Sequence, residues 1–376
     1  MLELTGHILT PEGFVLGQLR VDANGRIAEI SGQPVLESVV RQSSLPCVIP
    51  GFIDLHVHGG GGFDIMQGGP ALSKVSQMHA QHGTTSMLAT TMTAPPSDLQ
   101  KAFSAMQLAL NSQELLGSRV LGVHLEGPFI SEEKLGAQPN FSRAIAMDEL
   151  TQLNALFPIR LITLAPEVPG NMTLIPTLCQ AGFKVQLGHT AGTYEEGVQA
   201  MANGASGFTH LFNAMSGLAH RAPGMVGAAL AHAQHSEIIP DLIHVHPGAL
   251  RVALRAIPGL FCVTDSTSAA GMPDGEYLLG RHKVVKCMGG VRLADGTLAG
   301  STLTMDQALR NLVIHLGLSL QEASERVSFN AANYLGLTDR GQLQLGAWAD
   351  MVVMDTQLNL QDVYVEGRRI EITHAD

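Results

Sequence analysis

The middle of the chain alternates between apolar, strand-like runs and segments with helical periodicity. Between residues 47 and 340 the strand-like runs are CVIPGFIDL, TTSMLAT, RVLGVHL, IRLITLA, KVQLGH, GFTHLF, EIIPDLIHV and LFCVTD. Most are separated by helix-like segments, such as ALSKVSQMHAQHG, DELTQLNALF and TYEEGVQAMANG. Runs that stay apolar, instead of alternating with polar residues, indicate strands buried on both faces. Eight such strands with helices between them predict an α/β fold, a (β/α)8 barrel of the TIM type, over residues 47–340.

An open, doubly wound sheet is the alternative fold for the same pattern. That fold usually has a glycine fingerprint, GxGxxG, between its first strand and first helix. Here the four glycines at 59–62 follow the HVH of residues 56–58 instead. The barrel is therefore the preferred interpretation.

Both chain ends have a different pattern. Residues 1–46 and 341–376 consist of short runs in which apolar and polar residues alternate between turns. Asn24 and Gly25 form a typical hairpin turn between two such runs. Because chain termini often lie close together, we expect the two ends to pair into one small β-sandwich domain.

Composition and charge narrow the class of protein. Apolar residues make up 45% of the 376 residues and charged residues only 15%, which suits a compact enzyme and argues against disorder. The formal net charge is -11 and no basic run occurs, so binding to nucleic acid is not expected. An anionic substrate must therefore be met by local cations.

Location is predicted from features that the sequence lacks. The amino end has no basic region followed by an apolar stretch, and no 18-residue apolar run could span a membrane. The four cysteines have no CxxC spacing, so we expect reduced thiols. These features predict a cytoplasmic protein without a membrane partner.

Six of the eight predicted strands end in a histidine or a carboxylate. In a (β/α)8 barrel the carboxyl ends of the strands meet at one face, where active sites are built. The residues are, in strand order, His56 and His58, Glu126, His189, His210, His244 and Asp265. Five of the 16 histidines fall at these ends, so chance placement is hard to credit.

These residue types indicate a metal-dependent hydrolase. His56 and His58 lie at i and i+2, so they point to the same face of a strand and can bind one ion. The glycines that follow allow the metal and the substrate to approach the backbone closely. Glu126 would be costly as a buried charge unless it bound a cation. Asp265 could take a proton from a metal-activated water and return it to the leaving group.

Several motifs together resemble a known family. They are PGFIDLHVHG, HLEGPFI, LGHT, THLFNAM followed by RAPG, IHVHP, VTDS, DGTLAGS and GAWADMVVMD, and they cover essentially the whole chain. The chain thus resembles the amidohydrolase superfamily. Within it, EGPF with HLFNAM and LAGS is similar to the N-acetylglucosamine-6-phosphate deacetylases. The resemblance implies hydrolysis of the acetamide of N-acetylglucosamine-6-phosphate to glucosamine-6-phosphate and acetate.

The resemblance also implies the ligands of the metal. Glu126, His189 and His210 would hold the principal ion, and His56 with His58 would allow a second ion that shares Glu126. One or two divalent ions would bind per subunit, with zinc favoured and iron, manganese or cobalt as alternatives. Asp265 would be the general base and acid.

For the substrate, the resemblance implies five further residues. His244 would contact the acetamido carbonyl or the sugar, and Asn213 with Ala214 would offer donors to the phosphate. Arg221 would reach the phosphate across a homodimer interface as a charge-assisted pair. Gln138 stands where the family usually has a histidine, at a position expected to contact the hexosamine. N-acetylgalactosamine-6-phosphate, the epimer, therefore stays open as the substrate.

Two other functions fit the sequence less well. A dihydroorotase-like or dipeptidase-like enzyme of the same superfamily would more often place a lysine at a strand end to bridge two metals, and no lysine ends predicted strands three or four. A catalytically inactive barrel kept as a binding module should have lost a metal ligand or Asp265. All are present, so an active enzyme is the preferred interpretation.

Overall fold

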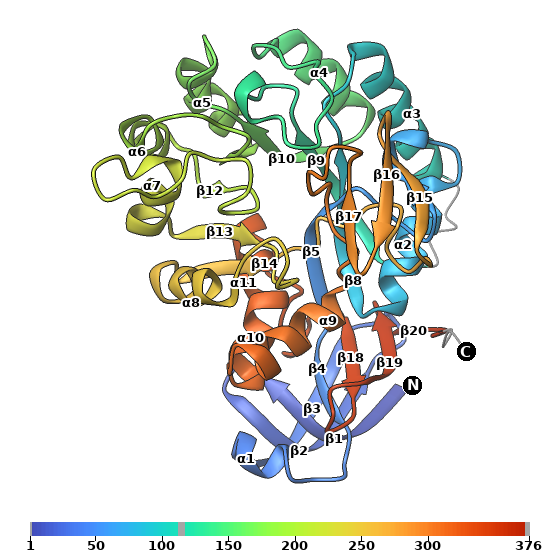
Figure 1. Cartoon of the computed structure of the whole chain (residues 1–376). Coiled ribbons are helices and arrows are strands. Elements are labelled where there is room, and N and C mark those ends of the chain that lie inside the picture. The colour runs from blue at the N-terminus through green and yellow to red at the C-terminus, as the bar shows by residue number, and fades with distance from the viewer. Residues whose placement is uncertain (1, 112–116, 373–376) are drawn as a thin grey trace.

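Eight parallel strands close into a barrel in the middle of the chain. The computed structural model describes residues 2–111 and 117–372. The barrel strands are β5 (Phe52–Val57), β8 (Thr84–Thr91), β9 (Arg119–Glu126), β10 (Ile159–Leu164), β11 (Lys184–Leu187), β12 (Gly207–Phe208), β13 (His235–Ile238) and β14 (Gly259–Cys262). The first six form one parallel sheet, and β13 pairs with β14. Backbone hydrogen bonds from Leu211 N to Glu237 O (3.0 Å) and from Asp265 N to His56 O (2.9 Å) join the two sheets. The predicted (β/α)8 fold is confirmed (Figure 1).

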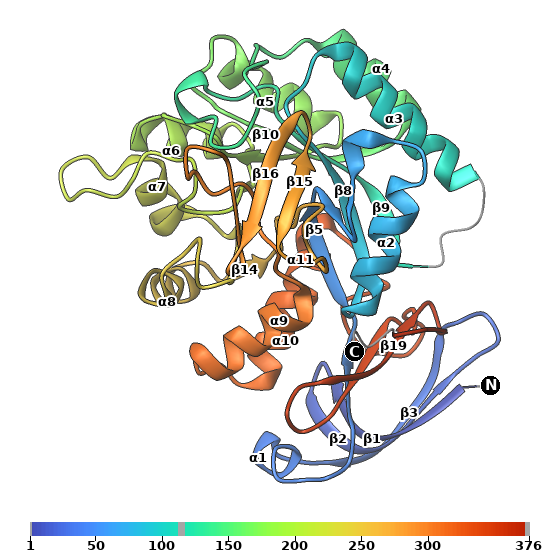
Figure 2. The same cartoon turned by 45° about the vertical axis from the view of Figure 1, so that its right-hand side comes forward.

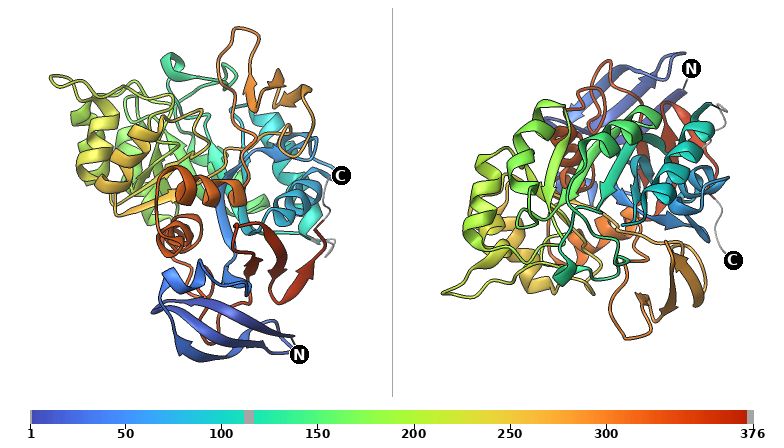
Figure 3. Two further views of the ribbon diagram at one scale, coloured as in Figure 1. Left: turned by 60° about the horizontal axis from the view of Figure 1, so that its bottom comes forward. Right: turned by 90° about the horizontal axis from the view of Figure 1, so that it is seen from above.

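Helices surround the strands, as the view from above shows (Figure 3). They are α2 (Ala71–Gln81), α3 (Pro96–Asn111), α4 (Met147–Leu156), α5 (Asn171–Gln180), α6 (Tyr194–Ala202), α7 (Gly224–His232), α8 (Pro247–Ala256), α9 (Met305–Arg310), α10 (Leu320–Val327) and α11 (Phe329–Leu335). The three segments predicted to be helical became α2, α4 and α6. In α6 the Thr193 side chain accepts from Glu196 N while the Glu196 side chain accepts from Thr193 N, a capping box that begins the helix. None of the helices in the described part of the chain is long and apolar enough to cross a membrane.

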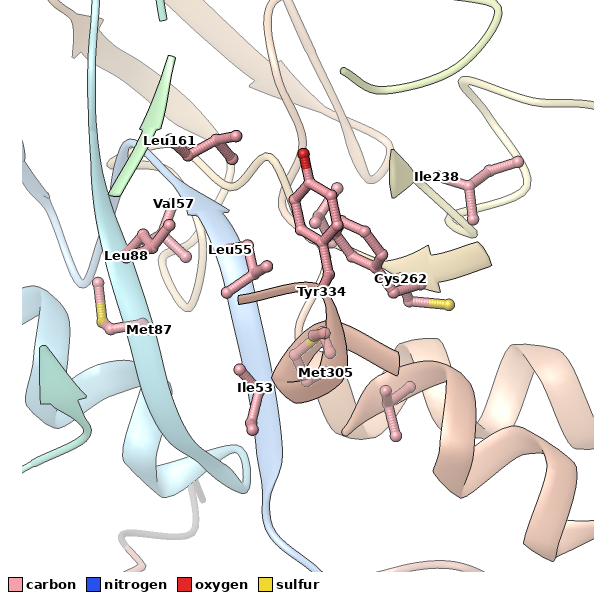
Figure 4. Close-up of a cluster of buried hydrophobic side chains, with 14 of the residues drawn as sticks. Ile53, Leu55, Val57, Met87, Leu88, Leu161, Ile238, Cys262, Met305 and Tyr334 are labelled. Atoms are coloured by element: carbon pink, nitrogen blue, oxygen red, sulfur yellow. The ribbon is translucent and has the colours of Figure 1, made fainter. Parts of the chain in front are cut away.

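In strand β5 the side chains alternate between the hydrophobic layer outside the barrel and the barrel interior. Ile53, Leu55 and Val57 belong to the main hydrophobic cluster, which packs the strands against the outer helices (Figure 4). Alternate side chains point to opposite faces of a strand, so Asp54 and His56 face the barrel interior. Both are fully buried. The barrel therefore has polar side chains inside its wall and an apolar layer outside.

Both chain ends form one separate sheet. Its seven strands are ordered β20-β19-β18-β4-β1-β2-β3. Their bounds are β1 (Leu2–Thr10), β2 (Gly13–Val21), β3 (Ile27–Pro34), β4 (Cys47–Pro50), β18 (Met351–Met354), β19 (Leu360–Val365) and β20 (Arg368–Ile370). Side chains from β1–β4, β18 and β19 share one buried cluster, so the sheet curls around a core of its own (Figure 1). The expected domain made by both termini is present, built from a single hydrogen-bonded sheet.

Several predicted strands are shorter than the runs that predicted them, among them β12, which covers only Gly207–Phe208 of GFTHLF. The run CVIPGFIDL is two strands, because β4 pairs with β1 and β18 of the terminal sheet while β5 begins the barrel. The run EIIPDLIHV is strand only as far as Ile238. Pro240 lacks a backbone N–H for the sheet, and the chain continues as a loop. His244 thus lies on a loop beyond β13, and its prediction as a strand-end residue was wrong.

A three-stranded antiparallel insertion, which the sequence pattern did not predict, follows β14. Its strands are β15 (Gly275–Leu279), β16 (His282–Cys287) and β17 (Gly290–Arg292). It stands on the outside of the barrel, in front of β10 in the turned view (Figure 2). The remaining short elements are α1 (Glu37–Val40), β6 (Gly59–Gly60), β7 (Phe63–Asp64), the 3₁₀ helices η1 (Ile65–Gln67) and η2 (Glu132–Lys134), and the π-helix η3 (Asn311–His315).

A buried arginine joins the terminal sheet to the barrel. Arg340 is 8% exposed, and its guanidinium donates to Asp350 Oδ2 (2.8 Å), Glu366 Oε1 (3.1 Å) and Ser86 Oγ (2.9 Å) of β8. Burial raises the pKa of Asp350 to about 6, although Arg340 lowers it. The arginine therefore compensates a buried carboxylate at the junction.

Replacing Arg340 with Met should destabilise the fold strongly. Removing one partner of a buried pair leaves an uncompensated charge, which costs about 3–5 kcal/mol. Arg369→Met is the matched control, because Arg369 pairs with Asp362 at the surface and exposed pairs contribute about 1 kcal/mol or less. Urea unfolding of both variants checks this. Equal losses in the two variants would contradict the role of the buried network.

Candidate metal centre and active site

The five predicted metal ligands and Asp265, the predicted general base, meet at the carboxyl end of the barrel. His56 lies in β5 and Glu126 ends β9. The other four come within a few residues after a strand: His58 after β5, His189 after β11, His210 after β12 and Asp265 after β14. All six are buried. The parallel arrangement explains the convergence, because every strand delivers its end to the same face.

The ligands form two groups that share a carboxylate. One consists of His56, His58 and Asp265, and the other of Glu126, His189 and His210, each with ligand atoms within 4.8 Å of one another. Glu126 Oε1 lies 3.1 Å from His189 Nε2 and 3.0 Å from His210 Nε2.

The second oxygen of Glu126 faces the other group. Glu126 Oε2 lies 3.1 Å from His58 Nε2, and Asp265 Oδ1 lies 3.3 Å from the same nitrogen. The Nε2 atoms of His56 and His58 are 3.2 Å apart. Glu126 thus bridges the two groups.

Three of the ligands have left-handed backbones. The φ angles are 47° at His189, 31° at His210 and 50° at Asp265. Residues other than glycine rarely adopt positive φ, because Cβ then crowds the backbone, and such strain is concentrated at functional sites. Here His189 and His210 turn their Nε2 atoms toward Glu126, and Asp265 turns its carboxylate toward His56 and His58.

Hydrogen bonds to the far ring nitrogens fix how two histidines present their Nε2 atoms. His56 Nδ1 lies 2.9 Å from Glu237 Oε2, and His189 Nδ1 lies 2.8 Å from the carbonyl oxygen of Lys134. An acceptor at Nδ1 holds the proton there and leaves the Nε2 lone pair for a metal. Glu167, which accepts from Thr190 Oγ1 and Ala191 N (both 2.6 Å), holds the loop beside His189.

A second buried carboxylate supports the His56 group. Asp54 accepts from Thr264 Oγ1 (2.6 Å), Thr264 N (3.2 Å) and His56 N (3.2 Å). Burial raises the pKa of Asp54 to about 7, against these hydrogen bonds. Asp54 thus ties β5 to the segment that carries Asp265.

When no metal is bound, the charges in the site favour a protonated His58 ring and ionised Glu126 and Asp265 carboxylates. Burial alone would lower the pKa of His58, but hydrogen bonds with Asp265 and Glu126 raise it to about 9. Burial would raise the pKa of Glu126, and the charges of His56 and His189 instead hold it well below its usual value. Likewise His56 and His58 keep the pKa of Asp265 low despite burial.

The donor set fits divalent metal ions. Imidazole nitrogens with carboxylate oxygens are ligands of zinc, iron, manganese and cobalt. The Nε2 atoms point at carboxylate oxygens in a buried site, where unpaired charges would be costly. The residues present can hold one ion in each group, with Glu126 shared between them.

A cavity of about 300 Å³ opens above the ligands. Its wall includes His58, Glu126, His189, His210 and Asp265 together with four of the predicted substrate residues, Gln138, Asn213, Ala214 and His244. His244 Nδ1 lies 2.6 Å from Asp241 Oδ2, which leaves Nε2 for a ligand. Glu133 and Leu279, which the sequence did not single out, also line the wall, as do Thr297 and Leu298 of the DGTLAGS motif.

Arg221 lies apart from this cavity. It is exposed on a loop, residues 217–222, that stands out from the body before α7 (Figure 2). It is not among the residues that line the cavity of its own chain. Its expected contact with phosphate would need a second copy of the chain.

Comparison with known proteins decides the family. A model of the amidohydrolase family matches residues 47–372. The chain belongs to the amidohydrolase family. The resemblance to the amidohydrolase superfamily is therefore confirmed, and the histidine and carboxylate groups described above could hold a metal ion.

Similar amidohydrolases include two amino-sugar phosphate deacetylases. The chain is 40% identical over 372 residues to N-acetylgalactosamine-6-phosphate deacetylase of Escherichia coli O157:H7, covering 96% of this chain and 97% of that protein. It is 39% identical over 354 residues to N-acetylglucosamine-6-phosphate deacetylase of Lysinibacillus sphaericus, covering 92% and 91%.

Solved structures agree over the whole chain. The N-acetylglucosamine-6-phosphate deacetylase of Thermotoga maritima matches with a TM-score of 0.89 at 31% identity, covering 98% of this chain and 99% of that chain. A mutant deacetylase from Mycobacterium smegmatis in complex with N-acetyl-D-glucosamine-6-phosphate matches equally well, with a TM-score of 0.89 at 31% identity over 98% and 99%.

Two supporting carboxylates of this amidohydrolase were missed from the sequence. Glu237 lies in β13 and Asp54 in β5, both fully buried. The signal was an acidic residue inside an apolar strand run, in SEII and in FIDL. Such a residue needs a buried partner, and here the partners are His56 and Thr264.

The metal-free protein should lose stability as pH rises from 6.5 to 9. The pKa of His58 is raised from 6.5 to about 9, so the folded chain favours the protonated ring. That contribution, about 3 kcal/mol, is complete below pH 6.5 and is lost as pH approaches 9. Urea unfolding after metal removal, at both pH values, measures it. The pH difference should be smaller in His58→Asn, and an equal difference in both proteins would contradict the assignment.

Proposed function

We propose that the chain is a metal-dependent deacetylase that hydrolyses the acetamide of N-acetylglucosamine-6-phosphate to glucosamine-6-phosphate and acetate. The observation that carries the proposal is the pair of ligand groups, one with Glu126 and one with Asp265, in the wall of a single cavity. The names of the relatives and the sugar phosphate bound by the Mycobacterium smegmatis enzyme support the substrate class.

Metal ions would be held by Glu126, His189 and His210, and by His56, His58 and Asp265 with Glu126 shared. Bound there, a divalent ion polarises the amide carbonyl and makes water a nucleophile at neutral pH. We propose zinc, which accepts this set of nitrogen and oxygen ligands. The proposal is for up to two ions per subunit.

Asp265 is proposed to move the proton. Its pKa is held low by His56 and His58 although burial would raise it, so it is a carboxylate at neutral pH. It would accept a proton as the water oxygen attacks the carbonyl carbon, and deliver it to the amide nitrogen as the C–N bond breaks. Acetate and the free amine leave.

The remaining cavity residues would orient the substrate. His244, held by Asp241, presents Nε2 to the acetamido carbonyl or a sugar hydroxyl. Asn213 and the backbone of Ala214 lie on the same wall and would donate to the phosphate. Orientation of this kind lowers the entropic part of the barrier.

N-acetylgalactosamine-6-phosphate is the second candidate substrate. The 40% identity to the Escherichia coli O157:H7 enzyme favours it. Amine release from both sugar phosphates, measured side by side with metal-loaded protein, tests the proposal. A higher kcat/KM for the gluco epimer supports the first assignment, and a higher value for the galacto epimer supports the second. Failure to hydrolyse either would refute the amino-sugar proposal.

We also propose a cytoplasmic homodimer in which Arg221 completes the neighbouring site. Its exposed position on a loop, outside the set of residues that line the cavity of its own chain, supports this role. The four free cysteines support a reducing compartment.

Arg221→Met should lower kcat/KM for the sugar phosphate by roughly 10- to 100-fold, because one charge-assisted contact to phosphate is lost. Arg255→Met, an exposed arginine on α8, is the control and should change little. Mixing Arg221→Met with Asp265→Asn subunits should restore activity, since mixed dimers contain one intact site. A mixture no more active than its components would contradict the contribution in trans.

A further inference from the structure

The side-chain amide of Gln138 is engaged at both ends. Its Oε1 accepts from the backbone N of Thr93 at 2.7 Å, and its Nε2 donates to Glu126 Oε2. A backbone N–H can only donate, so the amide oxygen must face Thr93 and the NH₂ group must face Glu126. Gln138 is 6% exposed, which leaves little of it for contact with a sugar.

The acceptor of this hydrogen bond is the bridging carboxylate. Glu126 Oε1 faces His189 and His210, whereas Oε2 faces His58. Gln138 binds Oε2, the oxygen that faces His58, whereas His56 Nε2 lies 3.5 Å from Oε1. A carboxylate oxygen has two lone-pair directions, so Oε2 can accept the amide proton and still serve as a ligand.

Thr93 and Gln138 come from different parts of the barrel mouth. Thr93 follows β8, and Gln138 lies in the loop after η2. The amide therefore bridges the end of β8 and the carboxylate that ends β9. Hydrogen-bond partners of this kind hold a ligating carboxylate in place, and their loss typically costs about 10- to 100-fold in metal affinity or activity.

We propose that Gln138 is a positioning residue: it orients Glu126 and thereby sets the affinity of the His56, His58 and Asp265 group for its ion. This role rests on the proposed metal-dependent function, but a metal titration tests it without any substrate. It differs from the sequence expectation that Gln138 contacts the sugar. A positioning role predicts changes in metal affinity and kcat, and a sugar contact predicts changes in KM and in the preference between epimers.

The test compares three variants with the parent protein. Gln138→Met keeps the length and removes both hydrogen bonds. Gln138→Asn keeps an amide that is one methylene too short to span Thr93 and Glu126, and decides the test if the Met variant does not fold. Asn140→Leu removes an exposed amide from the same loop and is the control.

Titration of metal-free protein with Zn²⁺ against a competing chelator gives the affinity of the protein for each of the two Zn²⁺ ions. In the Gln138 variants we expect the more weakly bound Zn²⁺ ion, the one held by the His56, His58 and Asp265 group, to lose roughly 10- to 100-fold in affinity. The tighter equivalent should change by less than about threefold, and kcat should fall while KM and the epimer ratio stay close to those of the parent. Asn140→Leu should match the parent protein.

Two results would overturn the proposal. Unchanged Zn²⁺ affinities with an altered KM or epimer ratio would make Gln138 a sugar contact. Unchanged Zn²⁺ affinities with unchanged kinetics would show that Gln138 contributes neither to metal binding nor to sugar recognition. Absence of turnover with either sugar phosphate would refute the proposed function, while the Zn²⁺ titration would still decide the role of Gln138.

Discussion

Asp265→Asn is expected to lower kcat by roughly 10²- to 10⁴-fold, the range that a general acid or base contributes. Asparagine keeps the shape of the side chain but cannot take a proton at neutral pH. KM should change little, because Asp265 acts on the reacting atoms. Steady-state amine release from N-acetylglucosamine-6-phosphate measures the effect.

Metal content distinguishes loss of proton transfer from loss of the site. The Glu126, His189 and His210 group does not include Asp265, so the variant should retain at least one ion per subunit. Asp274→Asn makes the same chemical change at an exposed residue and should leave kcat intact. A near-normal kcat in Asp265→Asn would eliminate Asp265 as the proton carrier.

Glu126→Gln should have the largest effect on the metal centre. Glu126 is the residue whose two oxygens face both ligand groups, and glutamine replaces one oxygen with an NH₂ group and removes the charge. We expect metal content to fall well below one ion per subunit, and kcat to fall at least about 10³-fold, since the chemistry needs the ion. Elemental analysis after dialysis, with kinetics on the same sample, tests both effects.

Glu133→Gln is the matched control for this substitution. Glu133 lines the same cavity but belongs to neither ligand group. It should keep its metal and most of its activity. A Glu126→Gln protein that held two ions as tightly as the parent would contradict the bridging role.

The fold and the location of the site could be predicted because the carboxyl ends of parallel strands meet at one face of a barrel. Because parallel strands deliver their ends to one face, continuous apolar runs ending in His56, Glu126, His189, His210 and Asp265 predicted the barrel and a shared site at its carboxyl end, whereas the division into metal ligands and the general base Asp265 came from the family resemblance. The structure places all five in two contiguous groups with His58.

What sequence reasoning missed depends on contacts between distant segments. Nothing local indicates that Glu237 meets His56, which is 181 residues away, or that Gln138 meets Glu126 and Thr93. The β4 strand was assigned to the barrel because Gly51 separates two equally apolar runs, and only pairing with β1 and β18 shows where it belongs. The β15–β17 insertion alternates weakly and has no motif.

The most direct test of the central claim is amine release from N-acetylglucosamine-6-phosphate by protein stripped of metal and reloaded with Zn²⁺ in measured equivalents. The account predicts negligible turnover without metal, recovery as the first two equivalents bind, and no further gain beyond two per subunit. Full activity in the stripped protein, or none after reloading with two equivalents, would contradict it.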